Sequence, residues 1–238
     1  MKNLLAKSLS GNQLKILAVI FMTIDHIGMI LFPTQKIFRL IGRLAFPIFA
    51  YTFAEGCKYT KNRTRHLLML CAMAALCQVV YTLTLNTLHM NILVTLSLSV
   101  VTIYSFDFAK KKGNLISYII PMAVLVCVFF ICYILPGFFS RASGFGIDYG
   151  FLGVMLPVLV YFGKDKNEKL FLLSIGLLIL GANSGLRQFF AICAVPILAL
   201  YNGERGKWKM KYFFYAYYPL HLAAIYLIGM FLTHFNII

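Results

Sequence analysis

Acidic residues are scarce in this 238-residue chain, which has 7 Asp and Glu residues against 22 Lys and Arg. Charged residues of all kinds make up only 12% of the sequence, whereas 61% of the residues are hydrophobic. Soluble domains are roughly 45–50% apolar, so this composition excludes a soluble globular protein. The chain also lacks a low-complexity segment, a convincing internal repeat and a soluble appendage. Residues 1–238 are therefore expected to form a single transmembrane helical domain.

Long apolar stretches fill most of the chain. A helix that crosses the hydrocarbon core needs about 20 mostly apolar residues, and nine such spans are predicted. Their bounds are 13–32, 37–57, 66–84, 91–108, 115–136, 147–163, 168–182, 185–201 and 212–232. The seventh and eighth are short enough to form a re-entrant pair. The expected fold is an all-α polytopic bundle of about nine transmembrane helices.

Basic residues fall in every second gap between these stretches. Of the 22 lysines and arginines, 17 lie at the N-terminus or in the loops near 58–65, 110–113, 164–169 and 203–211. Cytoplasmic loops are enriched in Lys and Arg, so we expect the N-terminus inside and the C-terminus outside. The net charge of +15 is spread over separate loops. This favours membrane lipids over nucleic acid as partners.

The usual signatures of metal sites and of membrane proteases are missing. The six cysteines lie within or at the ends of the spans and do not have the spacing of metal ligands. The sequence also lacks a zinc motif of the H-E-x-x-H type and a Ser–His or Cys–His pair. No metal is expected.

A few ionisable residues lie inside the predicted spans, where such groups are rare and mark function. They are Asp25, His26, Arg39, Arg43, Glu55 and His221, with Asp148, Arg187 and Gln188 at the outer boundary. Neighbouring side chains on a helix diverge by about 100°, so Asp25 cannot orient His26 as in a hydrolase triad. We expect Asp25 to neutralise Arg39 or Arg43, whose i, i+4 spacing puts them on one helix face. Gly42 between them allows close helix approach, and His26 then faces a cavity.

Each of these groups also has a purely structural interpretation. Asp25 and the arginines would join the outer hairpin, and each histidine would make a packing hydrogen bond. Glu55 would pair with Lys58 three residues later. The tyrosines near the inner end of the last span, Tyr217 among them, are expected to face lipid or the membrane interface.

Six segments of the chain share a recognisable pattern. They are LKILAVIFMTIDHIGMILFP, FRLIGRLAFPIFAYTFAEGCKYTKNRTRHLLML, NILVTLSL, IDYGFLGVMLPVLVYF, RQFFAICAVPILALYNGERG and KYFFYAYYPLHLAAIYLI. Together they resemble the TraX family of membrane proteins, and the resemblance covers most of the chain outside the region 110–140. It implies a multi-pass protein of the bacterial plasma membrane.

The resemblance also implies an activity. TraX is associated with N-terminal acetylation of conjugative pilin, and the family is similar to a wider group of transmembrane acyltransferases. That group takes acetyl-CoA on the cytoplasmic side and acetylates an acceptor on the far side. By position, His26 would be the reactive histidine, and Arg39 and Arg43 the supporting arginines. Apart from the resemblance, His221 is the next candidate, because it lies in the middle of the last span beside the helix-breaking Pro219. The acceptor would be a peptide N-terminus or a hydroxyl of a sugar or lipid.

Candidate binding residues follow from the expected donor, acetyl-CoA, which is anionic through its phosphates. Lys58, Arg63 and Arg65 offer cationic partners on the inner side, with Glu55 beside them. The candidates for acceptor binding at the outer boundary are Asp148, Arg187, Gln188 and Asn91. A small-solute or lipid transporter or flippase is the alternative. Transporters usually show paired repeats with broken spans at matching positions, and no such pairing is visible.

Overall fold

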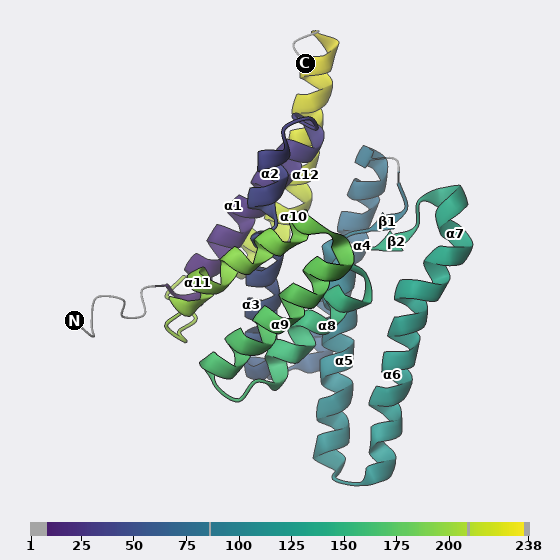
Figure 1. Cartoon of the computed structure of the whole chain (residues 1–238), viewed down its shortest axis with the longest axis vertical. Helices are drawn as coiled ribbons and strands as arrows, with labels where there is room; N and C mark the ends of the chain where they lie inside the picture. The colour runs from purple at the N-terminus through teal and green to yellow at the C-terminus, as the bar shows by residue number, and fades with distance from the viewer. Residues whose placement is uncertain (1–8, 86, 209, 236–238) are drawn as a thin grey trace, which may run out of the picture. The chain divides into compact units, whose positions relative to one another are not determined.

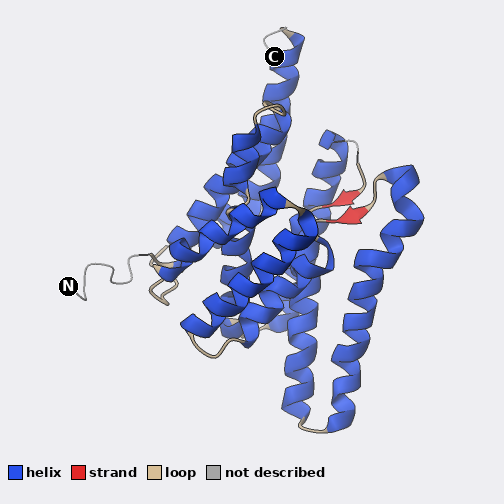
Figure 2. Cartoon of the chain, in the orientation of Figure 1, coloured by secondary structure: helices blue, strands red, loops and turns tan. Residues whose placement is uncertain are grey.

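The fold is almost entirely helical (Figure 2) in this computed structural model, which describes residues 9–85, 87–208 and 210–235. Within those ranges the only strands are β1 (His89–Met90) and β2 (Gly146–Ile147), which pair in parallel. The helical elements, in chain order, are α1 (Gly11–Ile30), α2 (Lys36–Gly42), α3 (Ala45–Tyr59), α4 (Arg63–Leu85), α5 (Ile92–Lys112), η1 (Leu115–Tyr118), α6 (Ile119–Phe129), η2 (Phe130–Ile134), α7 (Leu135–Ser143), α8 (Gly150–Phe162), α9 (Lys166–Ser184), α10 (Leu186–Phe189), η3 (Phe190–Cys193), α11 (Ala194–Ala199) and α12 (Lys211–His234).

Six helical segments in the described part of the chain are long and apolar enough to cross a membrane. They are Gly11–Ile30, Lys36–Tyr59, Arg63–Thr84, Ile92–Lys112, Leu115–Phe139 and Ala216–His234. The apolar helices Gly150–Phe162 and Leu186–Ala199 are shorter. At 1.5 Å per residue they reach only about 20 Å, against a hydrocarbon core of about 30 Å. The count of nine spans and their orientation therefore stay predictions.

Two compact units make up the chain, and each is described by itself. Unit 1 holds residues 1–52 and 164–238, and unit 2 holds residues 53–163. In unit 1, α2 and α12 both pack against α1 (Figure 1). The first and last spans of the sequence are thus neighbours, and this brings residues nearly 200 positions apart into contact.

The start of α1 is held by the loop that precedes α12. The first N–H groups of a helix have no partner within the helix. Here the backbone N–H groups of Gly11 and Asn12 donate to the carbonyl oxygens of Glu204 and Arg205, at 2.8 and 3.0 Å. The Asn12 side chain donates to the carbonyl of Trp208 at 2.7 Å. The segment YNGERG therefore anchors the first span from within unit 1.

Unit 2 is built around α5, which packs against α4, α6 and α8. One buried cluster joins the α3 end, α4, α5 and α8 through Cys57, Leu70, Val100, Ile103 and Val158. A second lies near the strand pair and consists of Val128, Cys132, Ile147 and Val154.

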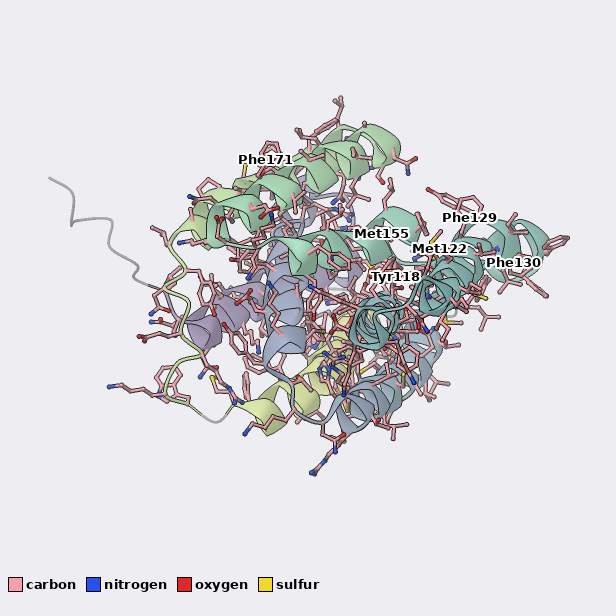
Figure 3. The ribbon with its side chains drawn as sticks, turned by 90° about the horizontal axis from the view of Figure 1, so that it is seen from below. Tyr118, Met122, Phe129, Phe130, Met155 and Phe171 are labelled. Carbon is pink, nitrogen blue, oxygen red and sulfur yellow. The ribbon has the colours of Figure 1, made fainter. Side chains whose placement is uncertain are left out.

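The long helical segment from η1 to α7 in unit 2 is mostly exposed. Its labelled side chains Tyr118, Met122, Phe129 and Phe130 stem from one continuous run of helix (Figure 3), and all four are exposed. Within it, η2 has the wider π-helical turn just before Pro136. Proline has no N–H to donate and crowds the preceding turn, which favours such a local adjustment. This exposed apolar surface fits the prediction that the segment spans a membrane, and Leu115–Phe139 is long and apolar enough to do so.

Candidate functional site

An ion pair joins α1 and α2. Asp25 Oδ2 on α1 accepts from Arg39 Nη1 on α2, and the two side chains are 20% and 27% exposed. Gly42 lies against the Asp25 carboxylate, so that a Cβ at position 42 would collide with it. The predicted pairing of Asp25 with one of the two arginines, and the predicted close approach at Gly42, are confirmed.

The sequence predicts one continuous helix through Arg39 and Arg43, but the structure breaks it between them and α3. α2 ends at Gly42, Arg43 is the residue that caps it, and α3 begins at Ala45. Pro47 explains the break, because its ring clashes with the carbonyl four residues earlier in an unbroken helix but is tolerated in a first turn. Arg43 is half-buried.

The two candidate histidines are in direct contact in unit 1. His26 Nδ1 on α1 lies 3.0 Å from His221 Nε2 on α12, and the ring centroids are 5.0 Å apart. His221 Nδ1 lies 2.9 Å from the carbonyl oxygen of Tyr217. The two histidines were predicted as alternative candidates for the reactive residue, whereas the structure places them in contact with each other. Asp25 uses a different face of α1, as the 100° divergence required, and the cavity expected beside His26 stays a prediction.

Tyr217 belongs to this site, although the sequence analysis assigned it to the lipid interface. Its ring stacks on His221 with a centroid distance of 5.1 Å and an interplanar angle of 7°. Its hydroxyl lies 2.7 Å from Thr23 Oγ1, and Thr23 donates to the carbonyl of Val19. The sequence does contain a signal for this placement. Tyr217 and His221 are spaced i, i+4, which puts both side chains on one face of α12.

The predicted donor-binding residues belong to unit 2. Lys58 Nζ donates to the carbonyl of Gly163 at 3.0 Å and lies 5.7 Å from the Tyr161 ring centroid. Glu55 is buried, and Arg65 is exposed in the first turn of α4. Lys58 is exposed as well, but its ammonium group is engaged by the two contacts just described.

Arg63 is tied into a polar network that the sequence analysis missed. It forms an ion pair with Asp107 on α5 and lies over the Tyr104 ring, 5.1 Å from the centroid. Asp107 also accepts from the Tyr161 hydroxyl at 2.6 Å, and the Tyr104 hydroxyl lies 2.7 Å from His66 Nδ1. Asp107 sits at the predicted end of a span beside three lysines, where an acidic residue looks like an ordinary boundary group.

Two of the predicted acceptor-binding residues, Asn91 and Asp148, lie in unit 2. Asn91 caps α5, because its Oδ1 accepts from the backbone N–H of Leu93 at 2.9 Å. Its amide donates to the Ala74 carbonyl at 3.0 Å and to Gln78 Oε1 at 2.9 Å. These bonds occupy both amide hydrogens of Asn91 inside the fold and leave none for an acceptor. Asp148 is half-buried beside the strand pair.

The other two, Arg187 and Gln188, lie on α10 in unit 1. Arg187 is exposed, whereas Gln188 is 4% exposed. Its side-chain nitrogen is buried and makes no hydrogen bond within the described residues. Buried polar groups are nearly always hydrogen-bonded, so this amide is an exception in the fold.

Comparison with known proteins assigns the sequence to a family. Residues 10–229 match the family model described as TraX protein, and this range contains every residue of the histidine and ion-pair sites. The chain belongs to the TraX family. With six apolar helical segments long enough to span among the residues that the structure describes, the TraX-family chain is a multi-pass membrane protein of bacteria.

Two related proteins show how far the TraX likeness extends. The chain is 31% identical to an uncharacterised protein of Rickettsia prowazekii (strain Madrid E) over 161 residues, which cover 66% of this chain and 57% of that protein. It is 23% identical over 261 aligned residues, covering 94% of this chain and 97% of the relative, to a Dichelobacter nodosus protein named "Probable fimbrial assembly protein FimC, serogroup H1". No solved structure matches the chain significantly.

Proposed function

We propose that this TraX-family protein is a membrane-embedded acetyltransferase. It moves an acetyl group from cytoplasmic acetyl-CoA to an acceptor at the outer side of the membrane. The acceptor is a peptide N-terminus, or a hydroxyl of a sugar or lipid, in the assembly of pili or fimbriae. The family assignment and the name of the Dichelobacter relative support the link to surface filaments.

The contact between His26 and His221 is the observation that carries the proposal. An imidazole is the side chain best suited to accept and return a proton near neutral pH. Here two imidazoles from the first and last spans share a hydrogen bond. The Asp25–Arg39 ion pair also brings one guanidinium group, that of Arg39 on α2, against α1. Ionisable groups within apolar spans mark functional sites by default.

The proposed step is a direct transfer within a complex of the protein, acetyl-CoA and the acceptor. The acceptor nitrogen or oxygen attacks the thioester carbonyl and passes its proton to His26. The carbonyl oxygen becomes negatively charged, and the guanidinium of Arg39 or Arg43 stabilises it. The carbon–sulfur bond then breaks, and the leaving thiolate takes the proton from His26 to give free CoA.

The donor is proposed to bind with its phosphates on the cytoplasmic side, near Arg65, Arg63 and Lys58. The exposure of Arg65 suits a group that meets a ligand from solvent, and the 44% exposure of the Arg63 side chain leaves N–H groups available beside Asp107. Arginine binds phosphate in a fixed two-pronged geometry. Glu55, which is buried, contributes to the shape of the site and not to anion binding.

Transfer is tested with the purified protein in lipid vesicles, radiolabelled acetyl-CoA and either a pilin-type peptide or a glycolipid. We expect CoA release and acetyl label on one of the two acceptors. The His234→Ala variant is the control for histidine substitutions and should retain the parental rate, because His234 is an exposed histidine at the end of the same helix as His221. CoA release no faster than in empty vesicles, with both acceptors present, would contradict the proposal.

A further inference from the structure

The hydrogen bonds of the histidine pair define which ring nitrogens carry protons. We infer that His221 is a positioning residue that holds His26 in the tautomer with its proton on Nδ1. Nε2 of His26 is then the nitrogen that carries the lone pair. The chemical use of this lone pair rests on the proposed acetyl transfer, but the tautomer itself is a property of the folded protein and is tested without it.

The assignment starts from the carbonyl oxygen of Tyr217. A carbonyl oxygen only accepts hydrogen bonds, so Nδ1 of His221 is the donor in the 2.9 Å contact. In the neutral ring the other nitrogen, Nε2, then has no hydrogen and is an acceptor. The 3.0 Å contact between His221 Nε2 and His26 Nδ1 therefore requires the hydrogen to be on His26 Nδ1.

These two bonds engage three of the four ring nitrogens of the pair. The His26 ring also contacts the backbone of Met22, four residues earlier on α1, which is a second group that can set the tautomer. The fourth ring nitrogen is Nε2 of His26, which in the neutral ring has a lone pair. A third proton can enter the pair without breaking either bond only at this atom. Proton transfer from an acceptor would then leave a positive charge on His26, and its Nδ1–H bond to His221 would become charge-assisted and stronger. His221 would thus play the part that a carboxylate plays beside a catalytic histidine.

A second contact between the same two helices keeps His221 in place. Thr23 has one hydroxyl hydrogen, which it donates to the Val19 carbonyl, so the Tyr217 hydroxyl must donate to Thr23 Oγ1. Thr23 and His26 are three residues apart on α1, and Tyr217 and His221 are four apart on α12, so each pair lies on one helix face. The Thr23–Tyr217 and His26–His221 contacts are consecutive cross-links between α1 and α12.

The direct test is ¹⁵N NMR of the wild-type protein with labelled histidine in lipid nanodiscs. A ring nitrogen that bears hydrogen and one that bears a lone pair have widely separated ¹⁵N shifts, and couplings to the ring protons distinguish Nδ1 from Nε2. The chain has 5 histidines, and the His26 signals are those lost in His26→Ala. We expect hydrogen on Nδ1 and a lone pair on Nε2 for His26. Hydrogen on Nε2 in the neutral ring would overturn the inference. The shifts are read in the wild-type protein, and His26→Ala serves only to assign them.

Two substitutions then test whether His221 is the cause. His221→Gln keeps an acceptor oxygen for His26 Nδ1, whereas His221→Met has similar bulk and no comparable acceptor. We expect the Met variant to lose the Nδ1–H form and the Gln variant to keep it. An unchanged His26 spectrum in a folded Met variant would overturn the role of His221 and would show that another group, such as the Met22 backbone, sets the tautomer.

Turnover gives an independent reading. Loss of the correct tautomer should lower kcat in His221→Met by about 10²–10⁴-fold, which is the contribution of a general base. KM for acetyl-CoA should stay unchanged, and kcat should be partly restored in His221→Gln. Equal losses in both variants would contradict a positioning role. If no variant and no wild-type sample transfers acetyl groups, the proposed function fails, while the NMR result still decides the tautomer.

Discussion

Replacing Asp25 by asparagine should weaken the attachment of α2 to α1. The substitution removes the negative charge that Arg39 meets and leaves a guanidinium in a poorly solvated position. The new amide is close in size to the carboxylate, so packing against Gly42 is kept and the electrostatic loss is isolated.

The size of the effect follows from the exposure of the pair. Breaking a fully buried ion pair costs about 3–5 kcal/mol, and an exposed pair contributes about 0–1 kcal/mol. The Asp25 and Arg39 side chains are 20% and 27% exposed, which places them nearer the buried limit. The amide still offers Arg39 an oxygen, so we expect a loss of about 2 kcal/mol in the free energy of unfolding.

The assay is equilibrium unfolding in mixed detergent micelles, followed by circular dichroism, on a double-mutant cycle of Asp25→Asn and Arg39→Gln. We expect a coupling energy of at least about 1 kcal/mol, since groups in contact couple by about 0.5–3 kcal/mol. Lys36→Gln is the matched control, because Lys36 is an exposed cation on the same helix. Additive single effects, or an equal loss in the control, would refute the reasoning.

Three further predictions concern topology, donor binding and the fold of unit 2. Single cysteines placed in the basic loops should not react with a membrane-impermeant thiol reagent applied to intact cells. Rapid labelling would show that the predicted orientation is wrong. The loops are those near 58–65, 110–113, 164–169 and 203–211. The double variant Arg63→Gln, Arg65→Gln should raise KM for acetyl-CoA more than it lowers kcat, because these groups meet the non-reacting end of the donor. An unchanged KM, or an equal rise in Lys36→Gln, would exclude the patch. Asn91→Ala should lower the free energy of unfolding by about 1 kcal/mol or more from loss of the α5 cap, measured by the same detergent titration, and no loss would contradict the capping role.

Local features of the site could be predicted from the sequence. The turn at Pro33 places Asp25 and Arg39 in adjacent antiparallel spans, and Gly42 signals close approach, so their pairing needs only helix geometry and a short connection. Pro47 was equally visible, and its clash with the fourth preceding carbonyl gives the break that separates α2 from α3. The predicted span 37–57 therefore consists of two helices, α2 and α3.

Contacts between distant segments could not be predicted in this way. Helical periodicity gives the face on which His221 lies but not which of the other spans packs against that face. His26 and His221 are 195 residues apart, and their contact depends on α12 returning to α1. Tyr217 looked like an interfacial aromatic for the same reason, because its partner Thr23 belongs to the far end of the chain. Asp107 was missed because its role appears only with Arg63 and Tyr161 beside it.

The most direct test of the central claim is the rate of acetyl transfer by purified His26→Ala protein. We expect turnover to fall by about 10²–10⁴-fold, the contribution of a general base, while KM for acetyl-CoA and the unfolding profile stay close to the parental values. His234→Ala should retain the parental rate. Transfer by His26→Ala at close to the parental rate would contradict the account and leave His221 as the next candidate for the catalytic base.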